Sequence, residues 1–167
     1  MKLIKETPLA ETYEDEDKII KNSKIWLEHL DSRWLQLYTE FNDEYGILPK
    51  IYDFTPNESI VMEKVSGRPL RLFYDGVFTE KTFLDCMRVL QEIKYFMANF
   101  SSKKGFAMLH HDLTVDNILM TSTHDYYVID IDSIRFDWPC HTLVTLGVEG
   151  YLMNQLISLK LSETRYS

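Results

Sequence analysis

The chain lacks the features that would direct it to a membrane, to the cell exterior or to nucleic acid. Its 167 residues carry 26 acidic and 18 basic side chains, a formal net charge of −8, which gives no general attraction for nucleic acid or anionic lipid. The N-terminal stretch has no apolar signal-peptide segment, and no run approaches the roughly 18 consecutive apolar residues of a membrane-spanning helix. We therefore expect a soluble, cytoplasmic protein that binds neither membranes nor nucleic acid.

Cysteine and glycine are also scarce. Two cysteines, Cys86 and Cys140, are too few for a disulfide framework, and we expect two ordinary buried thiols. None of the six glycines precedes Gly46, so the N-terminal part has no residue of the kind that lets backbone amides approach an anion closely. The 45% hydrophobic content is sufficient for one well-filled core.

The first part of the chain predicts strands around one helix. Trp34, Leu37, Tyr38 and Phe41 recur at helical spacing, and Gly46 supplies a stop. We expect a helix over residues 23–45 with these four side chains on its core face. Short apolar runs bounded by turn residues predict strands at "KLIKE", "AETYE", "KIIK", "ILPKIYDF" and "ESIVMEKV".

The second part predicts a long helix followed by a hairpin. "FTEKTFLDCMRVLQEIKYFMANF" has the apolar spacing of an amphipathic helix, with Thr79 as its N-cap. "ILMTSTHDYYVIDID" contains two apolar runs around a turn, which is a hairpin pattern. "YLMNQLISLKL" predicts a final short helix. The fold class is therefore α+β.

Polar residues concentrate between the long helix and the hairpin, in "LHHDLTVDNILM". His110, Asp112 and Asn117 form an H-x-D-x-x-x-x-N pattern, and Asp130 follows inside the apolar run "YYVIDID". A carboxylate at the end of a buried strand is costly unless it is paired, and a divalent cation pairs with it well. We expect Asn117 and Asp130 to bind a Mg²⁺ that carries nucleotide phosphates, while Asp112 deprotonates a hydroxyl nucleophile.

A zinc site is the poorer alternative for the same stretch. His110, His111 and Asp112 are consecutive, so their side chains rarely point at one metal, and no cysteine pair is near them.

These motifs resemble the protein-kinase-like superfamily. "HHDLTVDN" is similar to the H-R-D-L-x-x-x-N catalytic loop, and "VIDID" to the strand that ends in D-F-G. "KIIK" resembles V-A-I-K, "IVMEKVSG" resembles the strand and hinge that receive adenine, and "TLGVEGYLMNQ" resembles the end of an activation segment. The resemblance covers nearly the whole chain in the expected order.

The resemblance implies one kinase-like domain (1–167) with two lobes, a small β-rich N-lobe (1–65) and a truncated helical C-lobe (66–167). It implies ATP and Mg²⁺ as cofactors. Lys21 would contact the α- and β-phosphates, Met62 would be the gatekeeper, and the backbone of Glu63 to Val65 would receive adenine.

The glutamate that pairs with this lysine in the family is represented by Glu40 on the first helix, and Gln36, one turn earlier, is the alternative. His110 would pack beneath the D-F-G backbone and take no part in the chemistry. We expect Asp116 to be merely solvated.

The chain departs from the family pattern at four places. It has no Gly-rich loop; His111 replaces the arginine of H-R-D; Asp132 replaces the D-F-G glycine, with Thr114 in place of the usual lysine. The helical part of the C-lobe is also short, which would expose apolar surface along the final helix. We therefore expect a homodimer, or a partner that covers this surface.

The leading interpretation is an ATP- and Mg²⁺-dependent kinase that transfers the γ-phosphate to a hydroxyl. The activation-segment resemblance favours a protein Ser/Thr substrate, whereas Thr114 and Asp132 favour a small molecule. Two alternatives stay open: a catalytically silent kinase-like binding module, and a small-molecule phosphotransferase.

Overall fold

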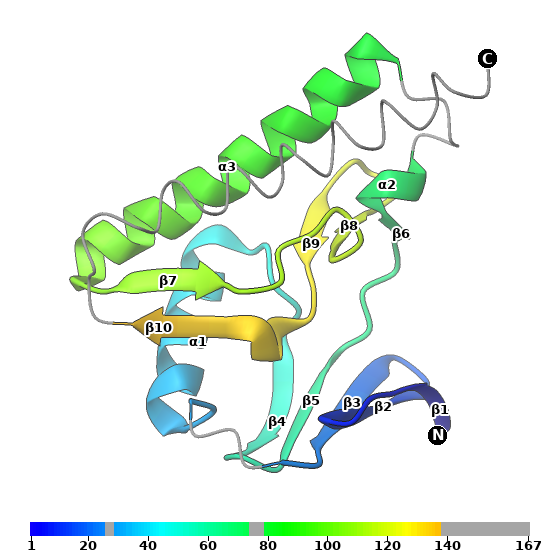
Figure 1. The fold of residues 1–167 in the computed structure, drawn as a ribbon, viewed down its shortest axis with the longest axis vertical. Helices are drawn as coiled ribbons and strands as arrows, with labels where there is room; N and C mark the ends of the chain where they lie inside the picture. The colour runs from blue at the N-terminus through cyan, green and yellow to red at the C-terminus, as the bar shows by residue number, and fades with distance from the viewer. Residues whose placement is uncertain (26–28, 74–78, 138–167) are drawn as a thin grey trace. The chain divides into compact units, whose positions relative to one another are not determined.

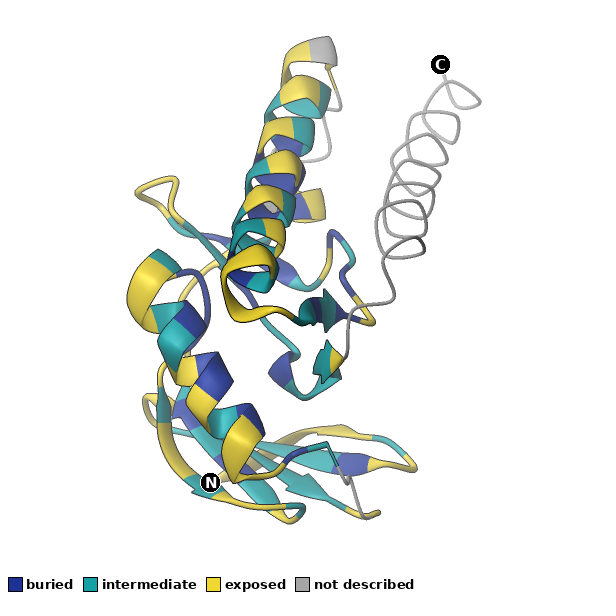
Figure 2. Ribbon diagram, turned by 90° about the vertical axis from the view of Figure 1, so that its left-hand side faces the viewer, coloured by how far each residue is buried: buried dark blue, intermediate teal, exposed yellow. Residues whose placement is uncertain are grey.

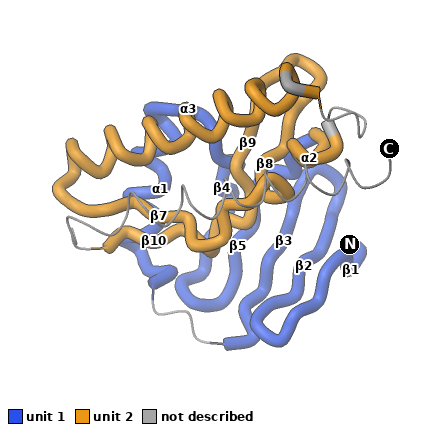
Figure 3. The backbone as a smooth tube through the Cα atoms, turned by 45° about the horizontal axis from the view of Figure 1, so that its top comes forward, with its two compact units in different colours: residues 1–66 blue, residues 67–167 orange. Residues whose placement is uncertain are grey.

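A computed structural model of the chain describes residues 1–25, 29–73 and 79–137. The fold is mixed α+β, and the chain divides into two compact units, 1–66 and 67–167 (Figure 3). Several predicted features fall outside the described residues: Cys140, His141, the activation-segment motif and the final helix. The homodimer or partner surface assigned to that helix therefore stays a prediction.

The first unit contains a five-stranded antiparallel sheet (Figure 1). Its strands lie in the order β1-β2-β3-β5-β4. The three-stranded meander β1–β2–β3 and the hairpin β4–β5 join through the β3–β5 pair. All the strands predicted for this part of the chain are present. Their bounds are Lys2–Glu6 (β1), Ala10–Asp15 (β2), Lys18–Ser23 (β3), Ile51–Thr55 (β4) and Ser59–Glu63 (β5).

Helix α1 spans Ser32–Tyr45, so the predicted start at residue 23 is wrong. The backbone N–H groups of Ser23 and Lys24 donate to the carbonyls of Glu58 and Leu9, which keeps this segment bonded to the sheet. Asp31 is the true N-cap, because its carboxylate accepts the N–H of Trp34 at 2.7 Å. Gly46 ends the helix with φ 65°, as predicted.

The predicted core face of α1 is confirmed, since Trp34, Leu37, Tyr38 and Phe41 are all buried. Figure 2 shows buried and exposed residues alternating around α1 and α3. Trp34 stacks on Phe54 of β4, with ring centroids 5.7 Å apart. The helix therefore covers the sheet face that carries Phe54.

The second unit is built on α3, Glu80–Lys104. Thr79 caps its N-terminus as predicted, by accepting the N–H of Thr82 at 3.2 Å, and Gly105 ends it. Cys86 on this helix is buried, and burial raises the pKa of its thiol to about 11. This thiol is therefore inert at neutral pH, as expected of an ordinary core cysteine.

Two small antiparallel sheets accompany α3 in this unit. One pairs β7 (Ala107–His110) with β10 (Ile134–Asp137). The other has the order β6-β8-β9 and contains the predicted hairpin. Its strands are Arg68–Pro69 (β6), Ile118–Met120 (β8) and Tyr126–Val128 (β9).

The segment around β6 lies very close to β8. A Cβ atom added at Gly67 would stand 2.8 Å from the backbone oxygen of Met120, so only glycine fits at this position without a shift of the backbone. Directly after β6 comes a single helical turn, α2 (Leu70–Phe73). Within the described ranges, no helix is long and apolar enough to cross a membrane.

Candidate functional site

The polar stretch singled out in the sequence forms the loop between β7 and β8. Leu113 and Val115 in this loop are buried, and so is Ile118 at the start of β8. These apolar side chains anchor the loop to the second unit, while Asp112 and Asp116 between them stay exposed. The alternation of buried and exposed positions keeps the two carboxylates at the surface of the unit.

His110 ties the loop to the segment before Asp130. Its Nε2 lies 3.0 Å from the carbonyl oxygen of Ile129, and its Nδ1 accepts the backbone N–H of Asp112 at 3.3 Å. These two partners require the neutral tautomer with the proton on Nε2. Burial lowers the pKa of His110, which favours the same neutral form. The predicted structural role of His110 fits this arrangement.

Asn117 is bonded both to Asp112 and to the residue that precedes Asp130. Its Nδ2 donates to the backbone oxygen of Asp112 at 2.8 Å and to the Asp112 carboxylate at 3.0 Å. Its backbone oxygen accepts the N–H of Ile129, the residue before Asp130, at 2.8 Å. Because Nδ2 carries both side-chain bonds, the amide oxygen Oδ1 is the atom left to bind a cation.

Asp130 lies two residues beyond the end of β9, close to the strand end at which the sequence analysis placed it. Its backbone has φ 62° and ψ 46°, the left-handed region that few residues other than glycine adopt. It precedes the short 3₁₀ helix η1, Ile131–Ser133, and the Ser133 hydroxyl lies 3.5 Å from its carboxylate. Glu16, Asn57 and His124, which lie in turns between strands, also have positive φ, so this conformation alone does not identify a functional site.

Magnesium fits the oxygen atoms that these residues offer. Asn117 and Asp130 present an amide oxygen and a carboxylate, which are oxygen donors of the type that Mg²⁺ prefers. No group of three or more His, Cys, Asp or Glu side chains in the described part of the chain is arranged to hold a metal alone. Mg²⁺ is commonly held by one or two protein ligands together with substrate phosphates, so the two residues suit a cation that arrives with a nucleotide.

Asp116 is not merely solvated, and this expectation was wrong. Its carboxylate accepts a hydrogen bond from Nε–H of Arg71 in α2 at 2.8 Å. About half of each side chain is exposed, so the ion pair adds little to stability. Arg71 carried no motif signal, because an ion pair between distant segments leaves no pattern in the sequence.

In the first unit, Lys21 lies on the sheet face that α1 covers. Lys21 pairs across the sheet with Ile60, which pairs in turn with Phe54, and directly opposed residues share a face. Ile19 and Met62 form the neighbouring pair on this face. Met62 and Ile60 are buried, whereas Ile19 and Lys21 are half-buried. The face therefore offers apolar surface beside one lysine.

The two candidates for the helix partner of this lysine interact with one another. Gln36 Nε2 donates to Glu40 Oε1 at 2.9 Å on α1. Glu40 is the half-buried member, and Gln36 is exposed. The ion pair between Glu40 and Lys21 stays a prediction.

The predicted hinge begins at the end of β5. The Glu63 N–H donates to the Lys50 carbonyl at 2.8 Å, and the Lys64 N–H to the Asp17 carbonyl at 2.9 Å. Among the described residues, no backbone carbonyl accepts the N–H of Val65. The role of Glu63 to Val65 in receiving adenine stays a prediction.

Comparison with known proteins finds a likeness in fold alone. No family model matches the chain, and no curated protein matches it. The structure of WbdD with the kinase inhibitor LY294002 superposes with a TM-score of 0.50 and 21% identity, over 90% of this chain and 36% of WbdD. Monomeric WbdD gives 0.52 and 20%, over 88% and 37%.

A third structure, described as the bifunctional kinase-methyltransferase WbdD, has a TM-score of 0.47 and 22% identity, over 78% of this chain and 31% of that one. This chain thus spans little more than a third of the WbdD chains it matches. The first two likenesses show that the mixed α+β architecture resembles part of the WbdD fold. At this level of identity they carry no residue role and no substrate.

Proposed function

We propose that the protein is a kinase-like phosphotransferase that uses ATP and Mg²⁺ to phosphorylate a hydroxyl group. The observation that carries the proposal is the arrangement around Asn117. One side chain holds the Asp112 carboxylate, leaves its own amide oxygen for a cation, and is bonded through its backbone to the residue before Asp130. The proposed base and one proposed cation ligand therefore lie on one loop, and that loop is bonded to the segment that precedes the other proposed ligand, Asp130.

Each residue has a distinct part in the proposed transfer. Asp112 orients the substrate hydroxyl and takes its proton as the oxygen attacks the γ-phosphorus, while the bond to the β-phosphate oxygen breaks and ADP leaves. Asn117 and Asp130 bind the Mg²⁺, which neutralises charge on the phosphates. Lys21, paired with Glu40, binds the α- and β-phosphates, and the hinge at Met62, Glu63 and Val65 receives adenine.

For the acceptor we propose a Ser or Thr residue of a protein. The activation-segment motif supports this choice, although that motif lies outside the described residues. Thr114 and Asp132 instead favour a small molecule, and the kinase activity named for WbdD is compatible with either class. The acceptor assay below therefore makes no assumption about which class is phosphorylated.

The decisive experiment incubates the purified protein with γ-labelled ATP, Mg²⁺ and cell extract, and follows labelled protein and labelled small molecules separately. Asp112→Ala is expected to lower transfer by about 10²- to 10⁴-fold, the usual contribution of a general base. Asp116→Asn is the matched control, because it removes the charge of an exposed carboxylate in the same loop, which forms an ion pair with Arg71. It should retain nearly full transfer.

The competing function is a catalytically silent binding module. The absence of glycine before Gly46 favours it, because glycine-rich turns usually support nucleotide phosphates. No transfer by the wild type, or equal transfer by Asp112→Ala, would contradict the proposed kinase activity. If transfer by the wild type is seen, identifying the labelled product decides between a protein and a small-molecule acceptor.

A further inference from the structure

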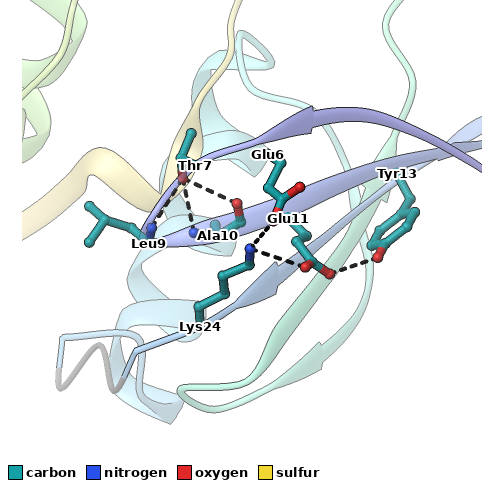
Figure 4. Close-up of polar contacts among 7 residues, drawn as sticks. All are labelled: Glu6, Thr7, Leu9, Ala10, Glu11, Tyr13 and Lys24. Carbon is teal, nitrogen blue, oxygen red and sulfur yellow. Dashed lines mark hydrogen bonds and ion pairs between the residues drawn. The ribbon is translucent and has the colours of Figure 1, made fainter.

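The turn between β1 and β2 is closed upon itself by the side chain of Thr7 (Figure 4). The Thr7 hydroxyl oxygen accepts the backbone N–H of Leu9 at 3.2 Å and that of Ala10 at 3.0 Å. The same hydroxyl donates to the Ala10 carbonyl at 3.1 Å, and the Thr7 N–H donates to that carbonyl at 2.9 Å. The remaining residue, Pro8, has no N–H at all.

Every backbone amide of this turn is therefore either used or absent. A turn that binds phosphate must direct several N–H groups outward, which is the property that glycine-rich loops supply. Here the amides of Leu9 and Ala10 point inward to one hydroxyl. The two side chains that the turn exposes, Pro8 and Leu9, are both apolar.

A second set of contacts holds the turn in this form. Lys24, which follows β3, bonds Glu6 of β1 at 2.5 Å and Glu11 of β2 at 3.1 Å (Figure 4). Tyr13 donates to the other oxygen of the Glu11 carboxylate at 2.7 Å. Hydrogen bonds with Glu6 and Glu11 raise the pKa of Lys24. Lys24 thus joins the strands on both sides of the turn.

We propose that the β1–β2 turn contributes nothing to phosphate recognition, so that ATP and ADP bind equally well until a divalent cation is added. The inference rests on the proposed function, since it concerns the nucleotide of that same site. Binding without metal would come from the base and from Lys21 acting on the α- and β-phosphates, which both nucleotides share. Selection of ATP would then depend on the cation held by Asn117 and Asp130.

The test measures dissociation constants of ATP, ADP and adenosine by calorimetry in EDTA, and again with Mg²⁺. In EDTA, ATP and ADP are expected to bind within about threefold of each other, a difference that is small beside a tenfold step. Addition of Mg²⁺ should increase the affinity for ATP more than the affinity for ADP. A larger preference for ATP in EDTA would overturn the inference while leaving nucleotide binding intact.

Two variants examine the assignment to Thr7. Thr7→Val keeps the shape of the side chain but frees the amides of Leu9 and Ala10, so the preference for ATP over ADP in EDTA should rise. Thr55→Val, the same change in β4, is the control and should behave as the wild type. An unchanged preference in a folded Thr7→Val protein would overturn the assignment. Absence of binding by all three ligands would instead remove the proposed function itself.

Discussion

At the scale of single residues, His110 determines how the proposed catalytic loop is held. The imidazole is buried, and its two nitrogens join Asp112 to Ile129 in the neutral form. A proton on Nδ1 would face the backbone N–H of Asp112, which is itself a donor. Protonation therefore opposes the folded loop directly, beyond the general cost of a buried charge.

This arrangement predicts a loss of stability in acid. Burial lowers the pKa of His110 in the folded protein, whereas the unfolded chain binds the proton near pH 6.5. The contribution of neutral His110 is thus complete above about pH 6.5 and is lost as the pH falls toward the folded pKa, at up to about 1.4 kcal/mol per pH unit. Urea unfolding from pH 7.5 to 5 measures this slope.

The variant His110→Gln provides the comparison, because glutamine does not titrate. The difference in free energy of unfolding between wild type and variant should be largest at pH 7.5 and should narrow as the pH falls. A difference that stays constant over this range would show that His110 is not responsible for the acid sensitivity.

At the scale of elements, the N-cap residue Asp31 sets the start of α1, which the spacing of apolar residues alone does not determine. Apolar spacing correctly predicted the buried face of Trp34, Leu37 and Phe41, but the backbone bonds of Ser23 and Lys24 to the sheet exclude an earlier start. We expect Asp31→Ala to cost about 1 kcal/mol of stability, the usual value of an N-cap. Asp31→Asn retains the acceptor and should remain close to wild type in chemical denaturation; equal losses would contradict the capping role.

The same contrast explains what the sequence could predict. The strands, the hairpin and the long helix follow from local periodicity and turn residues, and these predictions are confirmed. The ion pair of Arg71 with Asp116 and the contacts of Lys24 join segments far apart in the chain, so no local pattern contains them. The self-closed turn at Thr7 is an intermediate case: Thr-Pro marks a turn, but only the structure shows which amides the hydroxyl occupies.

At the scale of the whole molecule, the proposed functional residues divide between the two compact units. Lys21, Glu40 and the hinge belong to residues 1–66, whereas Asp112, Asn117 and Asp130 belong to residues 67–167. The two oxygen ligands proposed for Mg²⁺, from Asn117 and Asp130, are too few to hold the cation without nucleotide phosphates. The ligand that matters to the protein should therefore be the ATP–Mg²⁺ complex and not either component.

Thermal unfolding of the full chain tests this dependence. Mg²⁺ alone should leave the melting temperature unchanged, and ATP with Mg²⁺ should raise it further than ATP alone, by several degrees if about 2.7 kcal/mol is gained at a hundredfold excess over the dissociation constant. Asp130→Asn should lose the additional rise in melting temperature caused by Mg²⁺ and keep the rise caused by ATP alone. Lys21→Met should reduce both rises in melting temperature. Asp125→Asn, an exposed turn carboxylate bonded to Thr123, is the control and should shift as the wild type does. A magnesium effect that survives in Asp130→Asn would place the cation elsewhere.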